Sequence, residues 1–257
     1  MAARKKTVTT SNDYIEVKLP KATSLNRFVL VLIIIGLAFF AGYQTAKVTY
    51  WETKEKTLST SLTNNQGAKP TPTPQFYKVS NGHLPVLGKS SAKVTIIEFS
   101  DLQCLFCRRF WKDTLPQLKK DYIDRGLVKL AYRQFPLPAD LHPAARDLSE
   151  ASECANDQGK FWEFHDKTYA EQAAQGDGTI AVTPSDIANW ASSLGLDMTS
   201  FNDCFSNKKN AKKIDADQAD GQKVSVNSTP TFFVNGQILV GALPYSSFKT
   251  IIDQQLK

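Results

Sequence analysis

Residues that commonly bind transition metals are scarce in this sequence. The 257 residues include four cysteines and three histidines. Cys104 and Cys107 are the one closely spaced cysteine pair, because Cys154 and Cys204 each stand alone and the histidines have no partner at ligand spacing. A structural zinc site needs four suitably spaced ligands, so the sequence excludes a zinc-binding module.

Residues 82–257, which have the sequence pattern of a globular domain, carry no excess of positive charge. The net charge of the whole chain is +6, but residues 1–27 contribute +4 and residues 28–81 contribute +3. Residues 82–257 hold 20 basic and 21 acidic residues, a net charge of −1. Domains that bind nucleic acid carry clustered basic residues. The composition therefore excludes nucleic acid as a partner.

Long apolar runs are absent except for one. Residues 28–43 read FVLVLIIIGLAFFAGY without a charge, and with the milder residues up to 51 the run reaches the about 20 residues that a helix needs to cross a bilayer. We therefore predict a transmembrane signal-anchor over 28–51. One alternative is a buried core helix, against which the lack of a polar stripe argues. The other is a cleaved signal peptide, for which no clean Ala-x-Ala site follows.

The residues around this run determine its expected orientation. Six Lys/Arg precede it, whereas Lys47, Lys54 and Lys56 follow its apolar centre. The positive-inside rule then places residues 1–27, a basic tail, in the cytoplasm and the remainder of the chain outside. Residues 52–82 are rich in Thr, Ser, Asn and Pro and are too polar to pack, which predicts a flexible linker.

Residues 83–257 have the pattern of one α/β domain. A strand–helix–strand unit comes first, and its two strands are expected to be parallel. A helical insert (about 139–221), a two-stranded hairpin and a final helix follow. We predict strands at 94–99, 127–135, 231–234 and 237–240, helices at 104–126 (kinked at Pro116), 197–206, 208–221 and 245–256, and a helix start at 183–186.

Cys104 and Cys107 stand at the predicted start of the first helix. Unpaired amides and the helix dipole at that position stabilise a thiolate at Cys104, which lowers its pKa and makes it a good leaving group. Arg108 and Arg109 add positive potential, although arginines on a helix surface are more often simply solvated. A purely structural Cys104–Cys107 staple is the alternative, but it closes too small a loop to stabilise the fold much. The pair therefore indicates reversible redox chemistry.

Four motifs in order resemble the DsbA-like thiol–disulfide oxidoreductases of the thioredoxin fold, in their membrane-anchored or secreted form. They read VTIIEFSDLQCLFC, CANDQGKFWEFHD, STPTFFVNGQ and GALPYSSF. The resemblance covers roughly residues 83–257. It implies a thioredoxin fold with an inserted helical subdomain, preceded here by the predicted transmembrane helix and linker.

The resemblance also implies roles for individual residues. Cys104 matches the nucleophile and Cys107 the resolving cysteine. Pro230 matches a cis-proline beside the disulfide, although an ordinary trans bond is the commoner state of an X-Pro bond. Glu98 matches a buried acid that relays the proton of the resolving thiol; the alternative is a surface carboxylate on an edge strand. Thr229, which precedes this proline, is expected to contact substrate.

The dipeptide between the cysteines departs from the family pattern. It is Leu105-Phe106, whereas strong oxidases of the family often carry Pro-His. Without the histidine one stabiliser of the Cys104 thiolate is missing, so the reduction potential is expected to be less extreme than that of the strong oxidases. The apolar pair is instead expected to bind unfolded substrate.

The two remaining cysteines lie in the helical insert. Cys154 and Cys204 could be free buried thiols. In an extracytoplasmic domain a separated pair is more often bonded, so we predict a structural Cys154–Cys204 disulfide.

These features predict an extracytoplasmic, membrane-tethered monomer that introduces disulfides into reduced exported proteins. The cysteine pair carries the electrons, so no cofactor and no metal are required. The family implies reoxidation by a membrane quinone-linked partner of the DsbB or vitamin K epoxide reductase type. A disulfide reductase or isomerase and a tethered client-binding chaperone without turnover stay open as alternatives.

Overall fold

The computed structural model describes residues 29, 31–35, 37–40, 42–43 and 75–257. The chain divides into two units, 1–71 and 72–257, and the described residues of the first are helical. No helix in the described part of the chain is both long enough and apolar enough to cross a membrane. The predicted tail, half of the predicted anchor and most of the predicted linker lie outside the described residues.

A mixed four-stranded sheet forms the centre of the second unit, with strand order β2-β1-β3-β4. Strands β1 (Val94–Ser100) and β2 (Val128–Gln134) are parallel, whereas β3 (Thr231–Val234) runs antiparallel to both β1 and β4 (Gln237–Val240). This confirms the predicted strand–helix–strand unit and the hairpin. At the hairpin turn Asn235 and Gly236 have positive φ angles of 44° and 90°, the conformation that an Asn-Gly turn favours.

The helix after β1 differs in detail from the prediction of one helix with a kink. Helix α2 (Leu105–Arg109) continues into a π-helical segment (Phe110–Thr114), helix α3 (Leu115–Leu118) and a second π-helical segment (Lys119–Ile123). Pro116 lies in the first turn of α3, immediately after the π segment. Proline has no N–H to donate, so the wider hydrogen-bonding pattern before it accommodates the missing bond without ending the helix.

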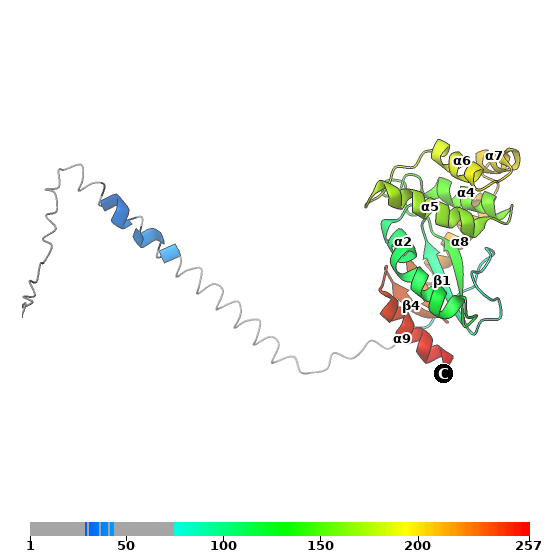
Figure 1. Ribbon diagram of the computed structural model, residues 1–257, viewed down its shortest axis with the longest axis horizontal. Helices are drawn as coiled ribbons and strands as arrows, with labels where there is room; N and C mark the ends of the chain where they lie inside the picture. The colour runs from blue at the N-terminus through cyan, green and yellow to red at the C-terminus, as the bar shows by residue number, and fades with distance from the viewer. Residues whose placement is uncertain (1–28, 30, 36, 41, 44–74) are drawn as a thin grey trace, which may run out of the picture. The chain divides into compact units, whose positions relative to one another are not determined.

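Five helices make up the insert between β2 and β3. The sequence predicted the bounds of two of them and the start of a third. In Figure 1 its first four helices gather at one end of the domain, away from the sheet and α9. The predicted helix start at Thr183 is confirmed, because its hydroxyl accepts from the backbone N–H of Asp186 in a capping box. The helices are α4 (Ala145–Asn156), α5 (Phe161–Gln175), α6 (Pro184–Ser193), α7 (Met198–Ser206) and α8 (Ala211–Lys223).

Aromatic side chains close one face of the sheet. Phe248 of helix α9 (Tyr245–Leu256) packs against Phe110 and Phe232, with ring centroids 5.5 and 4.9 Å apart. All three rings are fully buried. Burying a phenylalanine contributes roughly 1.5–3 kcal/mol, so this contact holds the helix that carries Cys104 and Cys107 firmly on the sheet.

The end of the predicted linker packs on the domain. The backbone N–H of Tyr77 donates to the carbonyl of Gly236 at 2.8 Å, and the Tyr77 ring lies 5.5 Å from that of Phe233. Phe76 forms an isolated β-bridge with Gln237. Strand β4 is the edge of the sheet and has free backbone groups to pair with. Contact with the domain therefore begins before residue 83, the boundary expected from composition.

Candidate active site

A tight turn after β1 brings Cys104 to the start of α2. Asp101 makes this turn: its Oδ1 accepts from the backbone N–H of Gln103 at 2.7 Å, and its carbonyl accepts from the N–H of Cys104 at 3.0 Å. Cys104 has an extended backbone, with φ −70° and ψ 124°, and its carbonyl begins the helix by accepting from the N–H of Arg108. Cys104 is therefore the N-cap residue of α2, as the sequence indicated.

Asp101 and His142 are site residues that the sequence analysis missed. The other carboxylate oxygen of Asp101 lies 2.8 Å from Nδ1 of His142 and accepts from the backbone N–H of Leu137 at 2.8 Å. Asp101 is fully buried, and its hydrogen bond raises the pKa of His142. An Asp three residues before a helix-capping residue is a turn signal that could have identified it.

The two free thiols are both buried but have opposite acidities. The Cys107 thiol donates a hydrogen bond to the Cys104 sulfur, and together with the Thr229 side chain and the Cys107 backbone N–H this lowers the pKa of Cys104 to about 6. Burial and the charge of Asp101 oppose the shift. Burial and the neighbouring Cys104 raise the pKa of Cys107. At neutral pH the pair therefore holds one thiolate, and it is on Cys104.

This assignment refines the electrostatic explanation drawn from the sequence. There the helix amides and dipole were expected to stabilise the thiolate. In the structure the hydrogen bond from the Cys107 thiol is the main cause of the low pKa of Cys104, and the backbone N–H of Cys107 contributes less. The reason is geometric: the two sulfurs share a site from which water is excluded, where a direct hydrogen bond is stronger than in solvent.

The segment before β3 lies against Cys104 although it is 125 residues away in the chain. The Cys104 sulfur lies 3.5 Å from the carbonyl oxygen of Thr229. The peptide bond between Thr229 and Pro230 is cis. The buried Thr229 hydroxyl has no hydrogen-bond partner among the described residues, which leaves it available to the sulfur beside it.

Glu98 lies inside the domain, on the central strand β1. Burial raises its pKa to about 8, and the charge of Cys104 acts in the same direction, so the carboxyl group is largely protonated at neutral pH. The hydroxyl of Ser100 donates to it at 2.7 Å and lies 3.3 Å from that of Tyr169. Since β1 is flanked by β2 and β3, the edge-strand alternative for Glu98 is wrong.

Ser100 and Tyr169 were also missed. Ser100 follows Glu98 by two residues and therefore points to the same face of the strand, a periodicity that could have identified it. No sequence signal links Tyr169 of α5 to this face. The charge of Glu98 also raises the pKa of Cys107, so the two buried groups influence each other's protonation.

An apolar surface borders the cysteine pair. Phe106 is 51% exposed and Leu105 is partly buried. The guanidinium of Arg109 lies 5.3 Å from the centre of the Phe106 ring and holds it by a cation–π contact. An exposed aromatic ring therefore lies two residues from Cys104 in the chain.

The other two cysteines form a disulfide within the insert. Cys154 of α4 and Cys204 of α7 are bonded, with a Cα–Cα distance of 5.8 Å. Among the described residues, one group of side chains is close enough to hold a metal ion, and it consists of Glu150 and these two cysteines. Their sulfurs are bonded to each other and are not thiolate ligands.

Comparisons with known proteins agree with this geometry. The model of the Thioredoxin family (Thioredoxin_4) matches residues 80–254. Disulfide bond formation protein D of Bacillus subtilis is 30% identical over 174 residues, which cover 67% of this chain and 77% of that protein. The crystal structure of oxidised BdbD from Bacillus subtilis has a TM-score of 0.64 at 29% identity and covers 71% of this chain and 98% of the other.

Two further similarities are partial. The Na⁺/H⁺ antiporter NhaA 1 of Salinispora arenicola is 35% identical over 153 residues, and the chain spans 22% of the length of that protein. Wolbachia pipientis α-DsbA1 has a TM-score of 0.58 at 22% identity and covers 75% of this chain and 95% of the other. The first similarity is confined to a small part of a longer protein, and the second establishes the fold alone.

Proposed function

Because this chain belongs to the DsbA-like thiol–disulfide oxidoreductases of the thioredoxin fold, we propose that it introduces disulfides into reduced exported proteins through Cys104 and Cys107. One observation carries the proposal. The pKa of Cys104 is lowered to about 6 while that of its partner Cys107 is raised. A stabilised thiolate favours the reduced form of the pair, and a pair that favours its reduced form oxidises other thiols.

The reaction begins with an oxidised Cys104–Cys107 bond. A thiolate of the client, the reduced protein being oxidised, attacks Sγ of Cys104, and the bond to Cys107 breaks. Cys107 is a poor leaving group because its pKa is high, and the protonated Glu98 supplies the proton that it needs.

A second client thiolate then attacks the client sulfur of this mixed disulfide. Cys104 leaves as a stable thiolate, and the client disulfide is complete. Two electrons pass from the client to the cysteine pair, and the client's two thiol protons go to Cys107, by way of Glu98, and to solvent. In this cycle Cys104 is the nucleophile and leaving group, Cys107 the resolving cysteine, and Glu98 the proton relay.

Thr229, Pro230, Leu105 and Phe106 bind the client in this proposal. The Thr229–Pro230 segment faces Cys104. Because proline has no N–H of its own, it takes up no backbone acceptor beside it, and the neighbouring backbone can pair with the client. The exposed Phe106 offers an apolar contact for an unfolded segment.

The proposed location is the outer side of a membrane, with residues 28–51 as the anchor and residues 1–27 in the cytoplasm. The apolar run and the lysine and arginine residues before it support this location. The Cys154–Cys204 disulfide also supports it, because such bonds persist in oxidising compartments. Reoxidation is assigned to a membrane quinone-linked thiol oxidase.

A Cys104→Ser variant tests the activity directly. We expect the oxidised wild-type protein to convert one equivalent of a reduced dithiol peptide to its disulfide, and the variant to convert none. Turnover by the variant would rule out the proposed role of Cys104. The reduction potential then distinguishes the direction: a value well above the about −270 mV of thioredoxin supports an oxidase, and a value close to it supports a reductase.

A further inference from the structure

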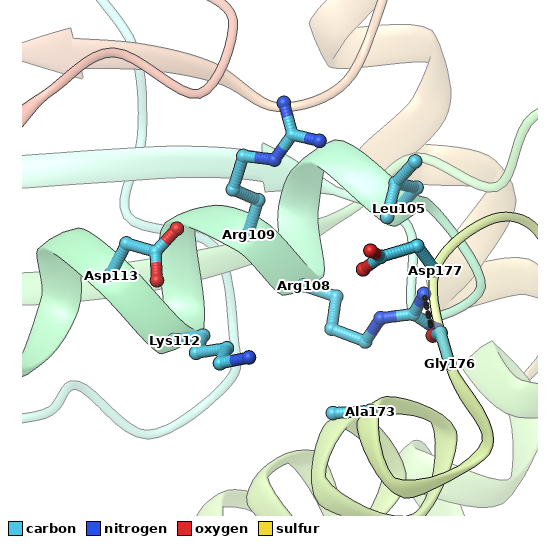
Figure 2. Close-up of a pocket in the computed structure, with 8 residues that line it drawn as sticks. All are labelled: Leu105, Arg108, Arg109, Lys112, Asp113, Ala173, Gly176 and Asp177. Carbon is cyan, nitrogen blue, oxygen red and sulfur yellow. Dashed lines mark hydrogen bonds between the residues drawn. The ribbon is translucent and has the colours of Figure 1, made fainter.

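A small polar cavity lies between α2 with its π-helical extension and the end of α5 (Figure 2). Its volume is about 70 Å³, several times the roughly 10–15 Å³ that one water molecule requires. Leu105, Arg108, Arg109 and Lys112 line it with the spacing i, i+3, i+4, i+7 of one helix face. The face begins at the residue next to Cys104.

Arg108 forms the floor of this cavity. The residue is 97% buried, and its guanidinium donates to the carbonyl oxygens of Gly176 and Gly178 at 3.1 and 2.8 Å, and weakly to Gln172 at 3.5 Å. Figure 2 shows it reaching from α2 to Gly176. These acceptors are neutral. A guanidinium has five N–H donors, so two of them have no acceptor within the described part of the chain.

The other two cations of the cavity, Arg109 and Lys112, likewise form no ion pair with any residue that the structure describes. Lys112 extends from the π-helical segment after α2 toward the same side as Arg108, while Arg109 stacks on Phe106. Asp113 and Asp177 belong to the lining, but within the described ranges neither is in ion-pair distance of a cation there. Three positive and two negative side chains leave a net charge of +1 around a cavity with a buried guanidinium.

We propose that this cavity binds a carboxylate of the client, carried by a residue near the cysteine that is being oxidised. The inference rests on the proposed function and adds a preference among clients. Arginine and lysine bind carboxylates by charge-assisted hydrogen bonds, and a partly buried site loses less of this attraction to solvent screening.

The distances suit this occupant. Lys112 follows Cys104 by eight residues, about 12 Å along a helix, and helical side chains lean back toward the N-terminus. In an extended client each residue spans about 3.3 Å, so an acidic residue two or three positions from the reacting cysteine reaches the cavity with its own side chain.

Two reduced dithiol peptides that differ only in Glu or Gln at those positions test the proposal. In single-turnover experiments with the oxidised wild-type protein we expect the second-order rate constant to be about three- to tenfold higher for the Glu peptide, mainly through tighter binding, as one partly screened charge contact provides. Lys112→Gln should reduce this ratio at least twofold. Lys120→Gln removes the same charge from an exposed position of the same helical run that does not line the cavity, and should leave the ratio unchanged.

Each outcome is decisive. Equal rates for the two peptides would overturn the carboxylate preference while the turnover of the Gln peptide still supports the proposed function. If the ratio falls equally in both lysine variants, the preference comes from the general electrostatic field of the helix. If Lys112→Gln slows the oxidation of both peptides equally, Lys112 acts in the reaction itself. Either result overturns the cavity as the carboxylate site. No oxidation of either peptide would refute the proposed function.

Discussion

Cys104 and Thr229 meet at 3.5 Å across the active site, from a helix start and from the segment that precedes β3. This contact is to the backbone carbonyl; the buried hydroxyl of the same residue has no hydrogen-bond partner among the described residues, and the Thr229 side chain helps to lower the pKa of Cys104. Thr229 thus joins the cysteine pair to the cis Thr229–Pro230 bond and gives the low pKa of Cys104 a cause outside α2.

Replacing this hydroxyl should make Cys104 less acidic. In Thr229→Val the shape of the side chain is kept, but the group that helps to stabilise the thiolate is lost. We expect the pKa of Cys104 to rise above the value of about 6 in the wild-type protein, as measured from the ultraviolet absorbance of the thiolate during a pH titration. The reduction potential should fall in parallel, because the reduced form is less stabilised.

Thr114→Val is a matched control for this change. Thr114 is also buried, and its hydroxyl donates to the carbonyl of Leu243 away from the cysteines. The control should lose stability but keep the Cys104 titration unchanged. Equal titrations of wild type and Thr229→Val would show that the hydroxyl plays no part.

Glu98→Gln should slow the enzyme and stabilise it at the same time. The amide keeps the size of the side chain but cannot supply a proton to Cys107, so we expect client oxidation in single-turnover experiments to slow at least tenfold. The pKa of Glu98 is raised by burial to about 8, above its unfolded value. Its contribution to stability is therefore complete below about pH 4.3 and is lost as the pH rises to about 8.

The stability effect has a defined pH dependence. Gln does not titrate, so the variant should unfold in urea with the higher free energy at pH 7, by on the order of 2–4 kcal/mol, and this advantage should vanish near pH 4. The hydroxyl of Ser100, which donates to Glu98 in the wild-type protein, can donate in the same way to the side-chain oxygen of the glutamine in the variant, so this hydrogen bond does not account for the difference. A difference that is the same at pH 4 and pH 7 would contradict the assignment of Glu98 as a buried, protonated acid.

Removing the insert disulfide should cost stability but not activity. The bond joins residues 50 positions apart, and a loop of this length is worth up to roughly 4 kcal/mol in the chain-entropy model. We expect Cys154→Ala/Cys204→Ala to unfold at a lower temperature by circular dichroism and to oxidise a dithiol peptide at the wild-type rate. Loss of activity in a folded double variant would show that the insert disulfide takes part in the redox cycle.

Local sequence signals predicted much of the fold. The hairpin follows from Asn235-Gly236, whose backbone angles this dipeptide favours, and the start of α6 follows from Thr183 and Asp186, which bond to each other within one turn. The π-helical segments around Pro116 were not predicted. The pattern of apolar residues is nearly the same for α- and π-turns, so only the packed backbone distinguishes them.

By itself the sequence determined that a cysteine pair follows a buried strand and caps a helix, because the turn at Asp101 and the first helical turn are made by neighbours in the chain. The tertiary structure alone decided that Thr229 lies against Cys104, that Asp101 meets His142, and how acidic Glu98 and the two thiols are. The physical reason is that a pKa depends on burial and on charges and donors nearby in space. Chain folding brings those groups together from positions that no spacing in the sequence relates.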